Sequence, residues 1–291
     1  VYCEQGAHGT SVYAGWGIPM VPGHEQCFAR LSPDGVFEVR IGAQSHGQSL
    51  ETTLAQVANE ILGVDPQNVR VIHGDTGLTP YSTGTWGSRC MVMSGGAVAT
   101  ASKEIAVRIK KIAGKIMEVA EQDLVLEHGA VRVAGTDRSM TLAEVAHIWY
   151  RKPQLLPADV DPAGLEVTAG YKTLRDSGTF SYACHALVIA LDTALGHSEI
   201  LDYVIVEDGG TLVNPMVVDG QIYGGTAQGI GTALYEEMPY DSEGQPLAST
   251  LADYMLPGPT EVPEPRIVHM STPDRKSTRL NSSHANISYA V

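Results

Sequence analysis

The chain has 291 residues, 43% of them hydrophobic and 18% charged, which is typical of a folded globular protein rather than a disordered one. Its formal net charge of -14 argues against general nucleic-acid binding, where a basic stripe is expected. No apolar run reaches the roughly 18 residues of a transmembrane helix. The sequence begins at Val1 without a start methionine or a signal peptide, so we expect a piece of a longer protein.

Strands and helices alternate along the first part of the chain. Residues 1–35 are rich in glycine, proline and aromatic residues and show no helical period. Periodicity then predicts a strand over 36–41, a helix over 50–62 ending at Gly63, a strand over 69–73 and a long helix over about 96–120.

The second part of the chain adds further strands and helices. A short hairpin forms around Val125 and Val131, and the capping box at Thr141 and Glu144 opens a helix through Tyr150. After a proline-rich connection, the pattern predicts strands over 165–171, 183–191 and 200–206, then two short helices over 214–223 and 225–234.

These elements predict an α+β fold of mixed sheets with packed helices. We expect a domain over 1–273 with two lobes, 1–163 and 164–273. Each lobe has a strand, a Gly/Gln turn and a helix with glutamine in its first turns, which suggests a two-fold pseudo-repeat.

Three segments combine glycine with small hydroxyl or amide side chains: His-Gly-Gln-Ser at 46–49, Gly-Thr-Trp-Gly-Ser-Arg at 84–89 and Gly-Gly-Thr-Ala-Gln-Gly at 224–229. Two of them lie where a strand gives way to a helix, and free N–H groups at a helix start favour an anion. Together they predict a site for a large ligand that carries phosphate and many hydrogen-bonding groups.

Each side chain in these segments has a possible role. Gln48 and Gln228 offer both donors and an acceptor, and Ser88 with the N–H groups after Gly84 and Gly87 suits phosphate oxygens. Arg89 has two open interpretations: a bidentate phosphate contact, or a buried ion pair with one of the many acids. The candidate cofactor-binding residues are Gly47, Gln48, Ser49, Gly84, Thr85, Trp86, Gly87, Ser88, Arg89, Cys90 and Gln228.

Several common sites are excluded. The chain lacks the P-loop pattern, a Gly-x-Gly-x-x-Gly after a strand and His-Glu-x-x-His. Its four cysteines, Cys3, Cys27, Cys90 and Cys184, form no Cys-x-x-Cys pair, so no direct metal ligands are expected and a cytoplasmic location fits. Cys184 and His185 point to opposite faces of a strand, which argues against a cysteine hydrolase.

The motifs occur in an order that resembles a known family. They are the 46–49 segment, Gly74-Asp75-Thr76, Pro80-Tyr81, the 84–89 segment, Gly95 to Val98, Glu207 to Gly210, Val213-Asn214-Pro215, Gly220-Gln221, Gly224 to Gly231 and Asp253-Tyr254. Over residues 1–273 the chain resembles the large subunit of the xanthine dehydrogenase / aldehyde oxidase family, and in particular the bacterial aerobic carbon-monoxide-dehydrogenase type.

The resemblance implies a molybdenum hydroxylase that oxidises an aldehyde, an N-heterocycle or carbon monoxide with oxygen from water. Its metal is held by the dithiolene of a molybdopterin, usually a cytosine dinucleotide in bacteria. Gln48 and Gly47 then contact the pterin and pyrophosphate, residues 85–90 form the wall beside them, and Gln228 approaches from the second lobe. Electrons leave through [2Fe-2S] clusters and FAD on separate subunits, which implies a dimer of heterotrimers.

The end of the chain departs from the family pattern. The segment carrying the family's general-base glutamate does not follow Thr272-Pro273, so no catalytic residue is expected and the chain alone is expected to be inactive. Residues 274–291 instead resemble a translated sequencing adapter, so we expect a non-native tail. The alternative function is a non-catalytic cofactor-binding or assembly module of the same fold.

Overall fold

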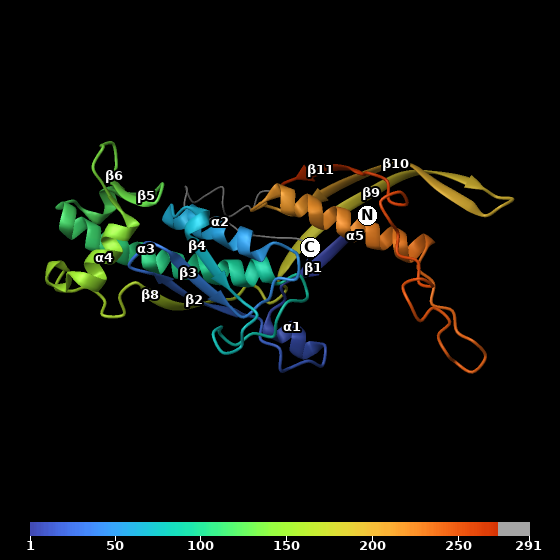
Figure 1. Cartoon of the computed structure of the whole chain (residues 1–291), viewed down its shortest axis with the longest axis horizontal. Coiled ribbons are helices and arrows are strands. Elements are labelled where there is room, and N and C mark those ends of the chain that lie inside the picture. Colours follow the sequence, from blue (N-terminus) through green and yellow to red (C-terminus); the bar gives the residue numbers. More distant parts are fainter. Residues whose placement is uncertain (273–291) are drawn as a thin grey trace. The chain divides into compact units, whose positions relative to one another are not determined.

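The computed structural model describes residues 1–272 (Figure 1). The described chain forms two compact units: unit 1 holds residues 1–4 and 180–272, and unit 2 holds residues 5–179. The tail predicted to be non-native, 274–291, lies outside the described residues. Unit 2 combines a four-stranded mixed sheet with several helices and unit 1 combines one with a single long helix, so the predicted α+β class is confirmed.

The main sheet of unit 2 has the order β4-β3-β2-β8. Its strands are β2 (Glu25–Leu31), β3 (Phe37–Ile41), β4 (Val69–Ile72) and β8 (Glu166–Tyr171). The central strand β2 runs antiparallel to both β3 and β8, whereas β3 and β4 are parallel. A parallel pair requires a crossover, and here helix α2 supplies it.

Two helices cover one face of this sheet (Figure 1). Helix α2 (Leu50–Leu62) buries Leu54, Ala58 and Leu62 at helical spacing, and α3 (Gly96–Met117) packs on β2 and β8. Gly63 ends α2 with a φ of 63°, and a Cβ there would lie 2.4 Å from the Cα of Glu127. Only glycine fits that helix end.

A three-stranded sheet completes unit 2, with β5 (Leu124–Glu127), β6 (Ala130–Val133) and β7 (Ser139–Thr141) followed by α4 (Leu142–Arg151). The predicted capping box is confirmed, because the N–H of Glu144 donates to the Thr141 hydroxyl at 3.1 Å and the Thr141 N–H donates to the Glu144 carboxylate at 2.8 Å.

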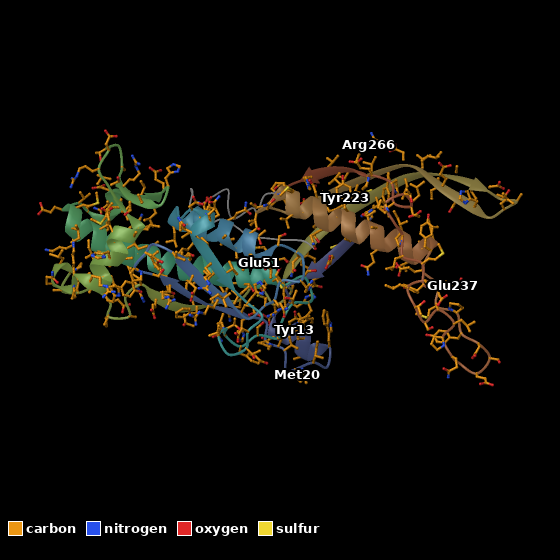
Figure 2. The ribbon with its side chains drawn as sticks, viewed as in Figure 1. Tyr13, Met20, Glu51, Tyr223, Glu237 and Arg266 are labelled. Carbon is orange, nitrogen blue, oxygen red and sulfur yellow. The ribbon has the colours of Figure 1, made fainter. Side chains whose placement is uncertain are left out.

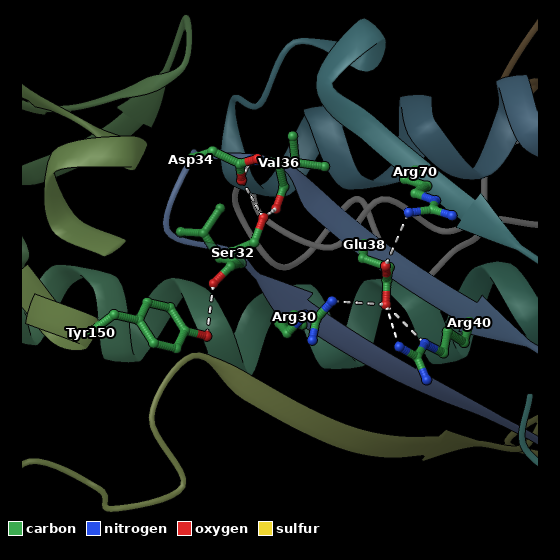
Figure 3. A network of polar contacts seen from close by, with 9 residues as sticks. Arg30, Ser32, Asp34, Val36, Glu38, Arg40, Arg70 and Tyr150 are labelled. Carbon is green, nitrogen blue, oxygen red and sulfur yellow. Dashed lines mark hydrogen bonds and ion pairs between the residues drawn. The ribbon is translucent and has the colours of Figure 1, made fainter. Parts of the chain in front are cut away.

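The sheet face away from α2 and α3 carries a charged network (Figure 3). Glu38 on β3 is buried and its carboxylate lies 2.7 Å from Arg40, 3.4 Å from Arg30 and 4.0 Å from Arg70. Side chains alternate along a strand, so residues 37, 39 and 41 face the helices while Glu38 faces the other way. The three guanidinium groups offset the cost of burying that carboxylate.

Unit 1 is built on a sheet with the order β1-β9-β10-β11. Its strands are β1 (Tyr2–Gly6), β9 (Thr179–Asp192), β10 (His197–Asp208) and β11 (Arg266–Met270). Helix α5 (Pro215–Leu234) packs on this sheet, and Ile230 joins Tyr203 and Ile205 in a small core. Between α5 and β11 the chain contains no named helix or strand.

The structure corrects several sequence-based expectations. The two helices predicted over 214–223 and 225–234 are one continuous helix, α5. The expected lobe boundary at 163/164 differs from the unit boundary, because β8 pairs with β2 inside unit 2. Strands β1, β2 and β11 and the short helix α1 (Thr10–Gly15) were not predicted from the sequence.

Candidate functional site

The 46–49 turn leads directly into α2. Gly47 and Ser49 both have a positive φ, 113° and 61°. The Gln48 side chain folds back on its own turn, accepting from the His46 N–H at 2.7 Å and donating to the Gln44 carbonyl at 3.4 Å. Gln48 therefore uses its side-chain amide to close its own turn. The backbone of Gly47 faces open space, because a Cβ there would meet no other atom within 4 Å.

The start of α2 is partly occupied by a carboxylate. Ser49 gives the helix no side-chain cap, but Glu51 lies in the first turn (Figure 2). A hydrogen bond from its own backbone N–H lowers the pKa of Glu51, and the carboxylate also lies 2.7 Å from His73 Nε2. Because a carboxylate already interacts with the positive end of this helix, an additional anionic ligand gains less there than the sequence suggested.

The 84–89 loop holds three residues in the left-handed region: Gly84 at 89°, Gly87 at 59° and Ser88 at 51°. This conformation is uncommon for serine and persists only when the surroundings impose it. Here Gly6 supplies the room, because a Cβ on it would lie 2.8 Å from the Cβ of Ser88.

One side chain joins the two segments. The Thr85 hydroxyl donates to the Gln44 carbonyl and accepts from the Gln44 N–H at 2.9 Å. Gln48 donates to the same carbonyl, so both segments meet at Gln44. Two of the three predicted segments thus lie side by side in unit 2, joined by Gln44 and Thr85, which are 41 residues apart in the chain.

Arg89 is a structural residue in this arrangement. Its side chain is fully buried and forms an ion pair with Glu25, which is 1% exposed. The ion-pair interpretation is confirmed, and the alternative of a bidentate phosphate contact is wrong for this geometry, because the guanidinium donates to protein oxygens.

An aromatic cluster packs against the 84–89 loop. Tyr13 in α1 (Figure 2) is fully buried, and its ring centroid lies 5.0 Å from that of Trp86. Burial raises the pKa of Tyr13, so the phenol stays protonated. His8 and Trp16 pack edge-on to one another, with centroids 4.6 Å apart.

Cys90 follows the loop and begins a π-helical turn, Cys90–Gly95, that continues into α3. Such turns are rare and often occur at functional sites. Burial raises the pKa of the Cys90 thiol, so it remains neutral and is not an activated nucleophile.

Gln228 lies on α5 in unit 1 and is exposed. Gly220 and Gly224, about two turns and one turn before it, would each accept a Cβ with no atom within 4 Å. This open face lets another backbone or a ligand come close to the Gln228 amide. Its convergence with the two segments of unit 2 stays a prediction.

Unit 1 also contains an apolar groove of about 1040 Å³ between α5 and strands β9 and β10. Its lining includes Leu187, Ile189, Leu191, Ile200, Ile222 and Ile230. Ile189 and Leu191 are 53% and 63% exposed. The His185 ring lies 2.8 Å from the Tyr203 hydroxyl, and burial lowers the pKa of His185. The groove is therefore lined mainly by apolar side chains.

A histidine clamp joins β10, β11 and α5 within unit 1. His269 on β11 lies 2.5 Å from Glu207 on β10 and 2.8 Å from Asp219 on α5. The hydrogen bond to Glu207 raises the pKa of His269, with a smaller contribution from Asp219. Sequence reasoning missed this group, since its members are 12 to 62 residues apart and no local pattern links them.

Residues that matter at the loop were also missed from the sequence. Glu25, Gln44 and Ser82 all contact it, yet none belongs to a glycine segment. Glu25 did leave one signal: an acid at a buried, alternating position of a strand needs a cationic partner. Among residues 1–272 no cluster of three or more histidines, cysteines or acids is placed to hold a metal, and no helix is both long and apolar enough to cross a membrane.

Comparisons with known proteins place this geometry in context. A family model described as a molybdopterin cofactor-binding domain matches residues 5–263. The chain is 35% identical to the carbon monoxide dehydrogenase large chain of Hydrogenophaga pseudoflava over 250 residues, covering 86% of this chain and 30% of that protein. It is also 35% identical to the nicotine 6-hydroxylase large subunit of Paenarthrobacter nicotinovorans over 274 residues, covering 94% and 33%.

Solved structures show the same similarity. Quinoline 2-oxidoreductase from Pseudomonas putida 86 matches with a TM-score of 0.84 and 36% identity, over 94% of this chain and 34% of that one. A Cu,Mo-containing CO dehydrogenase matches with a TM-score of 0.82 and 29% identity, over 94% and 34%. The chain spans about a third of the length of these relatives.

Proposed function

The chain belongs to the molybdopterin cofactor-binding domain family, and on this premise we propose that it forms part of the cofactor site of a molybdenum hydroxylase. The observation that carries the proposal is the junction at Gln44, where the 46–49 turn and the 84–89 loop meet. Both present glycine backbone at positive φ, with open space beside Gly47 and Gly84.

The residues present fit the organic part of a molybdopterin better than a bare metal ion. The described chain offers backbone groups, amides and hydroxyls at this junction, and the family model points to the same group. Gly47, Thr85, Gly87 and Ser88 would bind it from unit 2, and Gln228 would bind it from α5. When bound, the group supplies a molybdenum centre for hydroxylation with oxygen from water.

The role of this chain is then to bind and orient the cofactor. The left-handed turn at Gly87 and Ser88 directs backbone groups to one side of the loop. Trp86, whose ring lies 5.0 Å from that of Tyr13 between centroids, would form a wall of the site on that side. No residue of this chain is proposed as the general base.

The finer points of the proposal rest on relatives. We propose a cytosine dinucleotide form of the cofactor, and a substrate that is an aldehyde, an N-heterocycle or carbon monoxide. The names of the relatives speak of carbon monoxide, nicotine and quinoline, which supports this range. Names such as "large chain" and "large subunit" support partner subunits, which we propose carry the [2Fe-2S] clusters and FAD in a dimer of heterotrimers. The four free cysteines support a cytoplasmic location.

The test compares three glycines that share a positive φ and open surroundings. Gly47→Val and Gly84→Val alter the proposed site, while Gly135→Val, at a φ of 73° in unit 2 but in the loop between β6 and β7, is the matched control. The proteins are produced in a host that makes molybdopterin, and molybdenum and released CMP are measured per chain.

We expect the first two variants to lose molybdenum and CMP together while the control keeps both. Equal retention in all three would refute the assignment of the site. A wild-type protein that assembles with partners but contains no molybdenum would instead support the non-catalytic module.

A further inference from the structure

Arg89 closes the 84–89 loop at its base. One guanidinium nitrogen, Nη1, donates to the Gly84 carbonyl at 3.1 Å, and the other, Nη2, donates to the His24 carbonyl at 2.9 Å and the Pro22 carbonyl at 3.4 Å. The first and last residues of the loop are thus tied to each other and to the segment that enters β2.

Glu25 completes a closed ring of hydrogen bonds. Its Oε1 accepts from Arg89 Nη1 and from the Ser82 hydroxyl at 2.6 Å. The Ser82 oxygen in turn accepts from the Gly84 N–H at 2.9 Å. Both polar groups of the Gly84 backbone are therefore fixed by a buried ion pair whose members lie 64 residues apart in the chain.

The two charged side chains of the ring are buried. Arg89 is 0% and Glu25 1% exposed, so neither charge is offered to a ligand. What the ring does fix is the start and the end of a loop that keeps Ser88 in an unfavourable left-handed conformation. It also sets where Thr85 can reach Gln44.

We propose that Glu25 and Arg89 are positioning residues, which hold residues 85–88 ready for the cofactor without touching it. This inference rests on the proposed function of the loop. A purely structural ion pair would stabilise unit 2 equally well, so the two roles must be separated by experiment.

The decisive variant is the double replacement Glu25→Leu with Arg89→Met. Replacing a buried ion pair with apolar residues of similar size is often neutral for stability, whereas removing one partner leaves an uncompensated charge. We therefore expect the double variant to fold, although it no longer holds the Gly84 carbonyl. Arg89→Lys is the milder companion, because one ammonium group cannot reach all the oxygens that the guanidinium reaches.

Arg108→Lys is the matched control. Arg108 also pairs with an acid, Asp161, and donates to two backbone carbonyls, those of Gly164 and Glu166, but it lies on α3 away from the loop. All variants are made in a Trp16→Phe, Trp149→Phe background, so that Trp86 is the remaining tryptophan.

Urea unfolding first checks that each full chain folds, and two further measurements are then made. Acrylamide quenching of Trp86 in cofactor-free protein reports the loop alone, and cofactor retention, as molybdenum and CMP per chain, reports its function. For the double variant we expect an unfolding midpoint close to that of the unsubstituted background and severalfold stronger quenching. We also expect cofactor affinity to be about 10- to 100-fold weaker, the usual effect of losing a supporting partner. Arg108→Lys is expected to change neither quenching nor retention.

Each outcome decides between the roles. Wild-type quenching and retention in the folded double variant would overturn the positioning role and leave a structural ion pair. Stronger quenching with wild-type retention would instead refute the assignment of the loop to the cofactor site. The two failures are therefore distinguishable.

Discussion

Replacing His269 with glutamine should make the stability of unit 1 insensitive to pH in a range where the wild-type protein is sensitive. The protonated ring of His269 donates to two carboxylates, Glu207 at 2.5 Å and Asp219 at 2.8 Å. Only the charged form can donate from both nitrogens, so the clamp depends on protonation.

The size of the stability loss on replacing His269 follows from how exposed Glu207 and Asp219 are. Glu207 is 6% exposed at its side chain, so its hydrogen bond to a charged donor is worth about 1.5–3 kcal/mol. Asp219 is 41% exposed, and solvent screening reduces its contribution to roughly 0.5 kcal/mol. Glutamine keeps one neutral hydrogen bond, so we expect a net loss of about 2 kcal/mol below neutral pH.

The sign is fixed by the direction of the pKa shift. The pKa of His269 is raised in the folded protein, chiefly by Glu207, above the unfolded value of about 6.5. The stabilisation is therefore complete below the unfolded pKa and is lost as pH rises through the folded pKa. The gap between wild type and His269→Gln should be largest near pH 6 and should close at alkaline pH.

The assay must follow unit 1 separately. All three tryptophans, Trp16, Trp86 and Trp149, lie in unit 2, so their fluorescence does not report this transition. Urea unfolding is instead followed by hydrogen exchange of peptides covering β10 and β11. The control is His197→Gln, the same change at an exposed histidine on β10. A stability gap that stays constant from pH 6 to alkaline pH would refute the clamp.

Three further changes test the site and the fold. Thr85→Val removes the junction with Gln44, and we expect lower molybdenum content together with a loss of about 1 kcal/mol in urea unfolding. Gln228→Ala should weaken cofactor retention, because it removes up to three hydrogen bonds worth roughly 0.5–1.5 kcal/mol each, and unchanged molybdenum occupancy would count against its role. Thr141→Ala breaks the capping box and should lower the free energy of unfolding by about 1 kcal/mol. The fluorescence of Trp149 in α4 can be used to measure this change.

Local patterns predicted the elements whose stability is local. Helix α2 was placed at 50–62 because Leu54, Val57, Ala58 and Ile61 share a face and Gly63 ends it. The structure agrees on the bounds, and it buries Leu62 rather than Ile61. The same reasoning failed for α5, where Gly224 and Gly225 suggested a break. Glycine in a helix costs about 1 kcal/mol, and packing of Val218 and Ile230 on the sheet outweighs that cost.

Long-range partners could not be read from the sequence. Arg89 was recognised as either a ligand contact or half of an ion pair, but nothing in the spacing points to Glu25 as its partner. Strand β2 was missed because Phe28 interrupts the alternation of its buried residues Cys27 and Ala29 with polar neighbours. The glycine segments themselves were found, since left-handed backbone leaves a compositional mark.

Charge is distributed unevenly between the two units. The described residues of unit 1 include fourteen aspartates and glutamates but one basic residue, Arg266, a formal side-chain charge of -13; in unit 2, eighteen acids face fifteen bases, a charge of -3. Like charges repel and salt screens them, with a Debye length of about 10 Å at 0.1 M. Added salt should therefore stabilise unit 1 against unfolding far more than unit 2. The order in which the two units melt should then depend on the ionic strength of the buffer.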